Sequence, residues 1–170
     1  MTNRRLLLGT AVLASLIATP ARALCTYQGR NDFQTTIGQE FSDSRWVVRA
    51  KVLSAADGEV EAGKSDAGES WTTYRLRIIR TYKGDSLKQL KFFTMRNSGG
   101  FYMDRPWVDL PNGHDIGGEY LLFLNPIEAY EGQPHAERGG VFVNYNCGQS
   151  RPWAEISKSD RQQLERLAKR

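Results

Sequence analysis

The side chains that could take part in chemistry are few and widely spaced in this chain. His114 and His135 are its only histidines, and no His-Glu-x-x-His spacing, typical of catalytic zinc sites, is present. Cys25 and Cys147 are its only cysteines and form no paired metal-binding motif. No Gly-x-Ser-x-Gly turn is present to expose a serine nucleophile. We therefore expect neither a metal site nor a bound cofactor.

Isolated carboxylates offer the remaining chemistry. Asp104 and Asp115 could each act as a general base. Single acidic residues in connecting segments are far more often solvated surface residues, so we expect that role for both. The sequence thus predicts a protein that is not an enzyme.

Residues 1–23 are predicted to be a secretion signal. Arg4 and Arg5 form its basic start, residues 6–19 are uncharged and mostly apolar, and residues 21–23 have the small-x-small pattern of a cleavage site. Fourteen residues are too few for a bilayer span, which needs about 20. We therefore expect a secreted or periplasmic protein with no membrane span after signal removal. An uncleaved membrane anchor is the alternative.

Cleavage after Ala23 would change the charge balance and leave a single domain, residues 24–170. It removes three arginines and no acid, so the net charge falls from +4 to +1. No basic footprint for nucleic acid remains, and we expect no nucleic-acid partner.

The two cysteines predict one disulfide, because exported proteins usually pair their cysteines. A Cys25–Cys147 bond would tie the new N-terminus to a point just before the C-terminal helix. The chain-entropy model gives such a long closure about 4–5 kcal/mol at most. Two separate thiols are the alternative.

Alternating apolar residues predict a mainly β domain. In residues 44–54, Trp46, Val48, Ala50 and Val52 share one face of a strand. Residues 55–70 are small and acidic and predict an exposed connection. A second strand is expected at residues 71–82, with Arg75 and Arg77 pointing outward and a bulge at Ile78-Ile79. Three more strands are expected at residues 90–95, 119–124 and 140–145, and the apolar run at 119–124 predicts a central strand.

The C-terminal segment predicts a helix of about 12 residues. Ser157 and Asp160 form a capping pattern, and Leu164, Leu167 and Ala168 follow at helical spacing. Five strands and this α-helix predict a five-stranded closed barrel, which removes exposed strand edges. A two-sheet sandwich is the competing architecture.

Aromatic residues gather in the long connection formed by residues 96–118. Phe101, Tyr102, Met103 and Trp107 lie close together there, and rigid aromatic rings are good interface anchors. The alternative is that the connection folds back and uses these rings as a lid on the barrel.

Three blocks of residues resemble a known family. They are "FSDSRWVVRAKVLS" at 41–54, "YRLRIIRTYKG" at 74–84 and "CGQSRPWAEISKSDRQQL" at 147–164, with "EYLL" at 119–122 between the last two. In these blocks the chain resembles the netrin-like domain of the tissue inhibitors of metalloproteinases, as a divergent member of bacterial type. The resemblance implies an OB-fold-like closed barrel with a C-terminal helix packed on it.

The resemblance also implies a mode of action. In that family the first residue of the mature protein grips the catalytic zinc of a protease with its α-amino group and carbonyl oxygen. Cys25 matches the second cysteine of the family's Cys-x-Cys start, the first has no counterpart, and Ser42 stands where the family has another cysteine. The resemblance implies inhibition of a zinc metalloprotease through the N-terminal edge.

We therefore expect an exported, non-catalytic protein-binding module. Its expected partner surface joins the N-terminal edge to the aromatic connection and comprises Leu24, Cys25, Thr26, Tyr27, Ser98, Gly99, Gly100, Phe101, Tyr102 and Trp107. The alternative is an envelope-associated OB-type domain without inhibitory activity that binds saccharide or another small ligand on the barrel face, through Arg75 and Arg77.

Overall fold

The computed structural model describes residues 25–31, 33–59, 70–96, 100–105, 113–129, 133 and 135–170. The predicted secretion signal, residues 1–23, lies outside these ranges. Within them, no helix is both long and apolar enough to cross a membrane. The elements are β1 Thr26–Tyr27, β2 Arg30–Asn31, α1 Ile37–Asp43, β3 Trp46–Glu59, β4 Ser70–Lys83, β5 Gln89–Met95, β6 Glu119–Pro126, β7 Val141–Val143, β8 Arg151–Pro152, the 3-10 helix η1 Trp153–Glu155 and α2 Lys158–Leu167.

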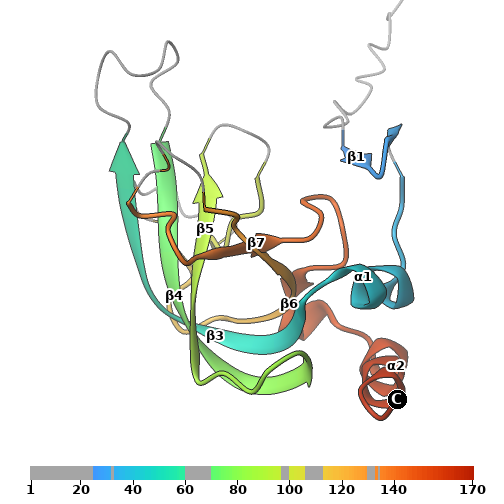
Figure 1. Cartoon of the computed structure of the whole chain (residues 1–170). Coiled ribbons are helices and arrows are strands. Elements are labelled where there is room, and N and C mark those ends of the chain that lie inside the picture. Colours follow the sequence, from blue (N-terminus) through green and yellow to red (C-terminus); the bar gives the residue numbers. More distant parts are fainter. Residues whose placement is uncertain are drawn as a thin grey trace, which may run out of the picture.

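Five strands close into an OB-fold-like barrel (Figure 1). Their order is β3-β4-β5-β7-β6, and β6 pairs again with β3 along Trp46–Lys51 to complete the circle. All pairings are antiparallel except β5–β7, which is parallel. The expected mainly β fold with a closed barrel and a C-terminal helix is confirmed. The two-sheet sandwich is wrong, because the β3–β6 pairing closes the five strands into one barrel, and the only other sheet among the described residues is the short β1–β2 hairpin.

Strand β6 lies between the two hydrophobic cores. Leu122 and Leu124 point into the barrel, where they join Val48, while Leu121 and Phe123 face the opposite way. On that second side they pack with Leu164 and other residues of the two helices. The nearly unbroken apolar run of β6 follows from burial on both faces, and its predicted central position is confirmed.

The predicted faces of β3 and β4 are also confirmed. Val48, Ala50 and Val52 are in the barrel core, whereas Arg75 and Arg77 are exposed. In the β3–β4 ladder Arg49 pairs with Arg80 and Ala50 with Ile78, so Ile79 has no opposite residue. This is the predicted bulge, and a bulge increases the local twist of a strand.

Two sequence expectations need correction. Residues 55–70 were expected to form a connection, but β3 continues to Glu59 and pairs with the start of β4. The helix α1 was not expected at all. It begins with a capping box in which the Thr36 hydroxyl accepts from Gln39 N–H and the Gln39 side chain accepts from Thr36 N–H.

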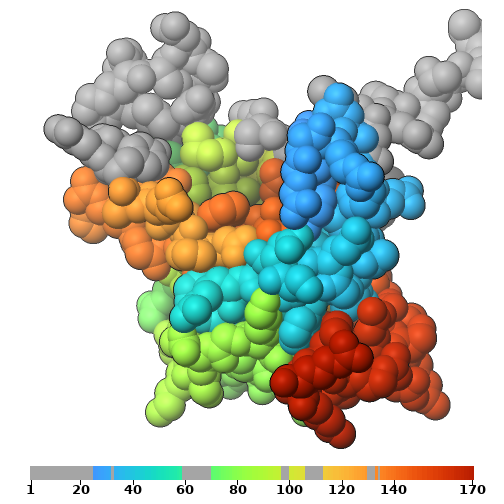
Figure 2. All heavy atoms as spheres, turned by 45° about the vertical axis from the view of Figure 1, so that its right-hand side comes forward, coloured from blue at the N-terminus to red at the C-terminus, as the bar shows by residue number. Residues whose placement is uncertain are grey.

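A disulfide joins Cys25 to Cys147, as predicted, with their Cα atoms 6.1 Å apart. The short β1–β2 hairpin that follows Cys25 is held further by Tyr27, whose ring lies 4.9 Å from that of Tyr145 and whose hydroxyl donates to Asp43 on α1. Figure 2 shows these blue residues resting against the cyan segment around α1, with α2 in red below. The N-terminal edge is thus fixed to the helical side of the molecule.

The double substitution Cys25→Ser/Cys147→Ser should lower the free energy of unfolding by about 2–4 kcal/mol, because it releases a closure between residues 122 apart. Urea unfolding followed by tryptophan fluorescence measures the loss. A loss below about 1 kcal/mol would contradict the idea that the bond stabilises the whole domain.

Candidate functional site

A cluster of polar side chains lies at one end of the barrel, around His114. The imidazole is only 8% exposed, and its Nδ1 lies 3.0 Å from Asp104 Oδ1 while its Nε2 lies 3.0 Å from Asp57 Oδ2. Asp57 comes from β3, whereas Asp104 and His114 face each other across an isolated β-bridge in the connection after β5. Both ring nitrogens therefore have a carboxylate partner.

Arg96 and two hydroxyl groups complete this cluster. The Arg96 guanidinium binds Asp104 through Nη1, 2.5 Å from Oδ2, and donates from Nε to Thr72 Oγ1 at 2.6 Å. The Tyr74 hydroxyl donates to Asp104 Oδ1 at 2.9 Å. Thr72 in turn donates to Asp57 Oδ1 at 2.5 Å. The network ties β3, β4 and the connection after β5 to one another.

The electrostatics of the cluster keep both aspartates ionised. Burial alone raises the pKa of Asp57, but hydrogen bonds from Thr72 and His114 outweigh it, and the net pKa is lowered. Burial likewise acts against the charge of Asp104, and its hydrogen bonds from Arg96, His114 and Tyr74 bring the pKa below its ordinary value. We call this cluster the latch, because its charged and hydrogen-bonded side chains join β3, β4 and the connection after β5. It consists of Asp57, Thr72, Tyr74, Arg96, Asp104 and His114.

The expected solvated roles of Asp104 and Asp115 are wrong. Asp104 belongs to the latch, and Asp115 accepts from Tyr120 Oη at 3.0 Å and from Arg105 Nε at 3.2 Å. Sequence reasoning missed the grouping because Asp57, Arg96 and His114 are far apart in the chain and form no spacing motif. The available signal was only that His114 and Asp104 share one connection.

The aromatic connection covers the same end of the barrel. The Phe101 ring packs edge-on against Phe92 and Tyr120, with centroids 6.2 and 6.3 Å apart, and Met103 is fully buried. The Tyr102 hydroxyl donates to the Met95 carbonyl at 3.0 Å. In the described part, the connection folds back as a lid on the barrel.

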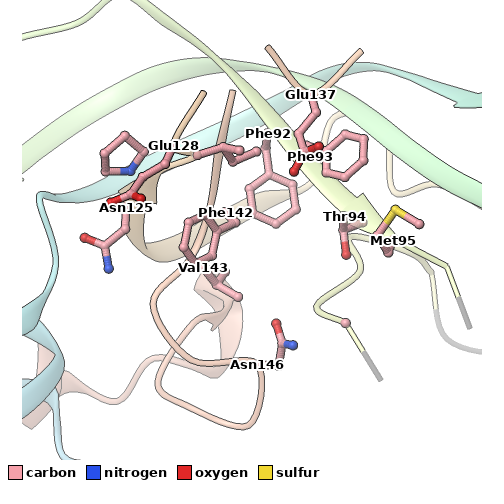
Figure 3. Close-up of a pocket in the computed structure, with 13 residues that line it drawn as sticks. Phe92, Phe93, Thr94, Met95, Asn125, Glu128, Glu137, Phe142, Val143 and Asn146 are labelled. Carbon is pink, nitrogen blue, oxygen red and sulfur yellow. The ribbon is translucent and has the colours of Figure 1, made fainter. Parts of the chain in front are cut away.

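A groove of about 720 Å³ opens beside this lid, between β5 and β7 (Figure 3). Gly100, from the aromatic connection, lies at one wall, and Asn146, next to the disulfide at Cys147, lies at another. Phe142, on β7, is 42% exposed and adds an aromatic ring to the lining of the groove. The complete lining is Phe92, Phe93, Thr94, Met95, Gly100, Asn125, Pro126, Ile127, Glu128, Glu137, Phe142, Val143 and Asn146.

The structure places the predicted partner-surface residues in different settings. Gly100 lines the groove, Phe101 and Tyr102 belong to the lid, and Cys25, Thr26 and Tyr27 form the tethered edge. Tyr27 is only 7% exposed, so its ring supports the edge from within. The predictions for Leu24, Ser98, Gly99 and Trp107 fall outside the described residues.

A second groove, of about 840 Å³, lies along the curled β4–β5 hairpin and is basic. Arg77 lines it together with Arg80, Lys83 and Lys88, and no carboxylate does. Arg80 pairs with Glu165, and Lys83 donates to two carbonyl groups at the end of α1. Part of this positive charge is therefore neutralised inside the domain.

Glu40 is a fully buried acid next to Gly148, the residue that follows Cys147. Its Oε1 accepts from Gln149 N–H at 2.7 Å and from the Thr35 hydroxyl, but Oε2 has no partner among the described residues. Burial raises the pKa of this carboxyl, and the effect outweighs both hydrogen bonds and the charge of Arg151. Gly148 is required here because a Cβ would overlap the carboxyl group.

Within the described residues, no group of three or more His, Cys, Asp or Glu side chains could hold a metal ion. No known family model matches the chain, and no curated protein is significantly similar to it. The resemblance to the metalloproteinase inhibitors therefore stays a prediction made from the quoted blocks.

Asp104→Asn should lower the free energy of unfolding at pH 7 by about 1–3 kcal/mol, because Arg96 and His114 lose a charged acceptor. The lowered pKa values mean that the unfolded chain binds protons before the folded one as pH falls below the ordinary aspartate pKa of 3.8. The wild type should therefore lose stability in acid more steeply than the variant. Urea unfolding at pH 7, 4 and 3 measures both slopes.

Asp85→Asn is the matched control, because Asp85 is 69% exposed and its ion pair is with the exposed Arg45. It should change stability by less than about 0.5 kcal/mol. Equal losses of unfolding free energy in Asp104→Asn and Asp85→Asn would show that the latch stabilises the protein no more than an exposed ion pair does.

Glu40→Gln should gain stability relative to the wild type as pH rises. A carboxyl with a raised pKa contributes stability below its unfolded pKa, and that stability is lost as pH rises through the folded pKa. The amide variant cannot ionise, so it escapes this loss. Unfolding measured from pH 4 to 8 should show the free energy of unfolding of Glu40→Gln rising relative to that of the wild type. Glu155→Gln, at an exposed position, is the control. If the free-energy difference between Glu40→Gln and the wild type does not change with pH, the assignment is refuted.

Proposed function

We propose that residues 24–170 form an exported, non-catalytic protein-binding module. The observation that carries this proposal is the groove between β5 and β7, whose wall at Asn146 adjoins the disulfide that fixes the N-terminal edge. An exposed large apolar side chain, Phe142, lies in it. Concave apolar surfaces held on a rigid scaffold are typical of binding sites.

The hydrogen-bonding groups of the latch are occupied by one another, which supports a role without catalysis. A general base needs a free lone pair facing the substrate. Both nitrogens of His114 face carboxylates, and the ring is 8% exposed. This cluster of ionisable groups thus holds the lid and the strands together.

The partner class that we propose is a zinc metalloprotease. This step rests on the family resemblance and on the tether. After cleavage at Ala23, the new α-amino group would belong to Leu24, one residue before the bridged Cys25. A free amine and a carbonyl oxygen are suitable zinc ligands, so a fixed edge could present them to the protease.

A saccharide ligand is the second candidate, and the basic groove favours it. Arg77 and Lys88 line that groove with no carboxylate beside them, which suits an anionic sugar. The same experiment can separate the two functions.

Mature protein with a sequenced N-terminus is measured against a panel of purified zinc metalloproteases, for inhibition and for direct binding, and against a glycan array. We expect binding to at least one protease that weakens by about tenfold or more, over 1.4 kcal/mol, when one residue is added before Leu24. Arg77→Ala, the control, should leave it unchanged. Glycan binding that Arg77→Ala abolishes, without any protease binding, would replace our proposal by the second candidate.

A further inference from the structure

The positive charge of the mature chain is concentrated in two segments. Residues 77–89, the curled part of the β4–β5 hairpin, carry four basic side chains and one acidic one, a net charge of +3. Residues 157–170, which include α2, carry five basic side chains and two acidic ones, again a net of +3. We call these two segments the basic end. Since residues 24–170 together have a net charge of only +1, all the other residues of the mature chain carry −5.

The two segments of the basic end lie side by side. Arg80 pairs with Glu165 and so joins the hairpin to α2. In Figures 1 and 2 the curled green hairpin and the red helix form the lower end of the molecule, and the blue N-terminal edge lies at the upper end. The basic end therefore faces away from the N-terminal edge.

Much of the charge at the basic end is left unneutralised. Arg77 and Lys88 line the basic groove, and no carboxylate among the described residues pairs with either of them. Arg166 and Lys169 are exposed and, within the described ranges, are likewise without a carboxylate partner. The single acid of the hairpin, Asp85, is already held in an ion pair. Such a one-sided set of cations attracts an anionic surface.

An apolar side chain projects among these cations. Ile79 lies at the bulge of β4, has no opposite residue in the β3–β4 ladder and is 41% exposed. Leu87, which is half-buried, lines the same groove. An aliphatic side chain adds little to the binding of a hydrophilic polyanion, but it can enter the boundary between lipid headgroups and acyl chains. Cations around an exposed isoleucine therefore favour a lipid surface.

We propose that the basic end binds the surface of a membrane that contains anionic phospholipids. Arg77, Lys88, Arg166 and Lys169 lie against the headgroups, and Ile79 enters the boundary below them. The N-terminal edge then faces away from the membrane, where a partner protein can reach it. This inference goes beyond the proposed protein-binding function and does not depend on it.

The test measures co-sedimentation of the mature protein with phosphatidylcholine vesicles that either contain or lack phosphatidylglycerol. We expect binding only to the anionic vesicles, and we expect it to weaken as salt is added. Arg77→Gln/Lys88→Gln should weaken this binding by about tenfold or more. The control, Arg105→Gln/Arg138→Gln, removes the same charge from exposed positions outside the basic end and should change binding by less than about twofold.

A serine at the bulge separates a lipid surface from a soluble polyanion. Ile79→Ser should weaken vesicle binding by about fivefold or more, because the apolar contact is lost. It should leave any binding to soluble polygalacturonate, an anionic saccharide, unchanged. Ile116→Ser is the matched control, since Ile116 is 45% exposed in the connection before β6, and it should change neither. Urea unfolding checks that each variant is folded.

Equal binding to the two kinds of vesicle, or binding to neither, would overturn the inference. Equal losses in the two double variants would do the same. Binding to polygalacturonate without binding to anionic vesicles would assign the basic end to a saccharide. Self-association in sedimentation velocity that Ile79→Ser abolishes would assign it to a second copy of the chain. Protease binding is measured without vesicles, so failure of this inference and failure of the proposed function are distinguishable.

Discussion

The pairing of β6 with β3 is the constraint on which the rest of the molecule depends. It closes the barrel, and it places one strand between two cores, with Leu122 and Leu124 on one side and Leu121 and Phe123 on the other. The helices can pack only because that second face exists. Their position then fixes the segment around Cys147 and, through the disulfide, the N-terminal edge.

The barrel is closed by an extended ladder between β3 and β6, but β5 and β7 pair only briefly. The barrel is held by long antiparallel ladders on most of its circumference, but by one registered pair at the parallel contact. Loops at that point, including Gly100 and the residues after β6, therefore leave a groove rather than a packed seam. The latch and the aromatic lid keep the end of the barrel closed, so the opening stays on the side of the sheet.

The sequence predicted what depends on local alternation. The faces of β3 and β4, the bulge at Ile79 and the burial of β6 could all be read from period-two patterns and apolar runs. The helix α1 could have been found from the Thr36–Gln39 capping box, yet its short length left little periodicity. The latch and the groove could not be predicted, because only the three-dimensional path of the chain brings His114 to Asp57 and places Gly100 and Asn146 around one groove.

The disulfide joins a residue made early in synthesis to one made 122 positions later. Since a ribosome builds the chain from its N-terminus, Cys25 cannot form its disulfide until 122 further residues have been added. Every shorter intermediate carries an untied leading end, however much of the barrel it has already formed. The N-terminal edge can therefore be tied to the rest of the domain only after the chain has been extended as far as Cys147.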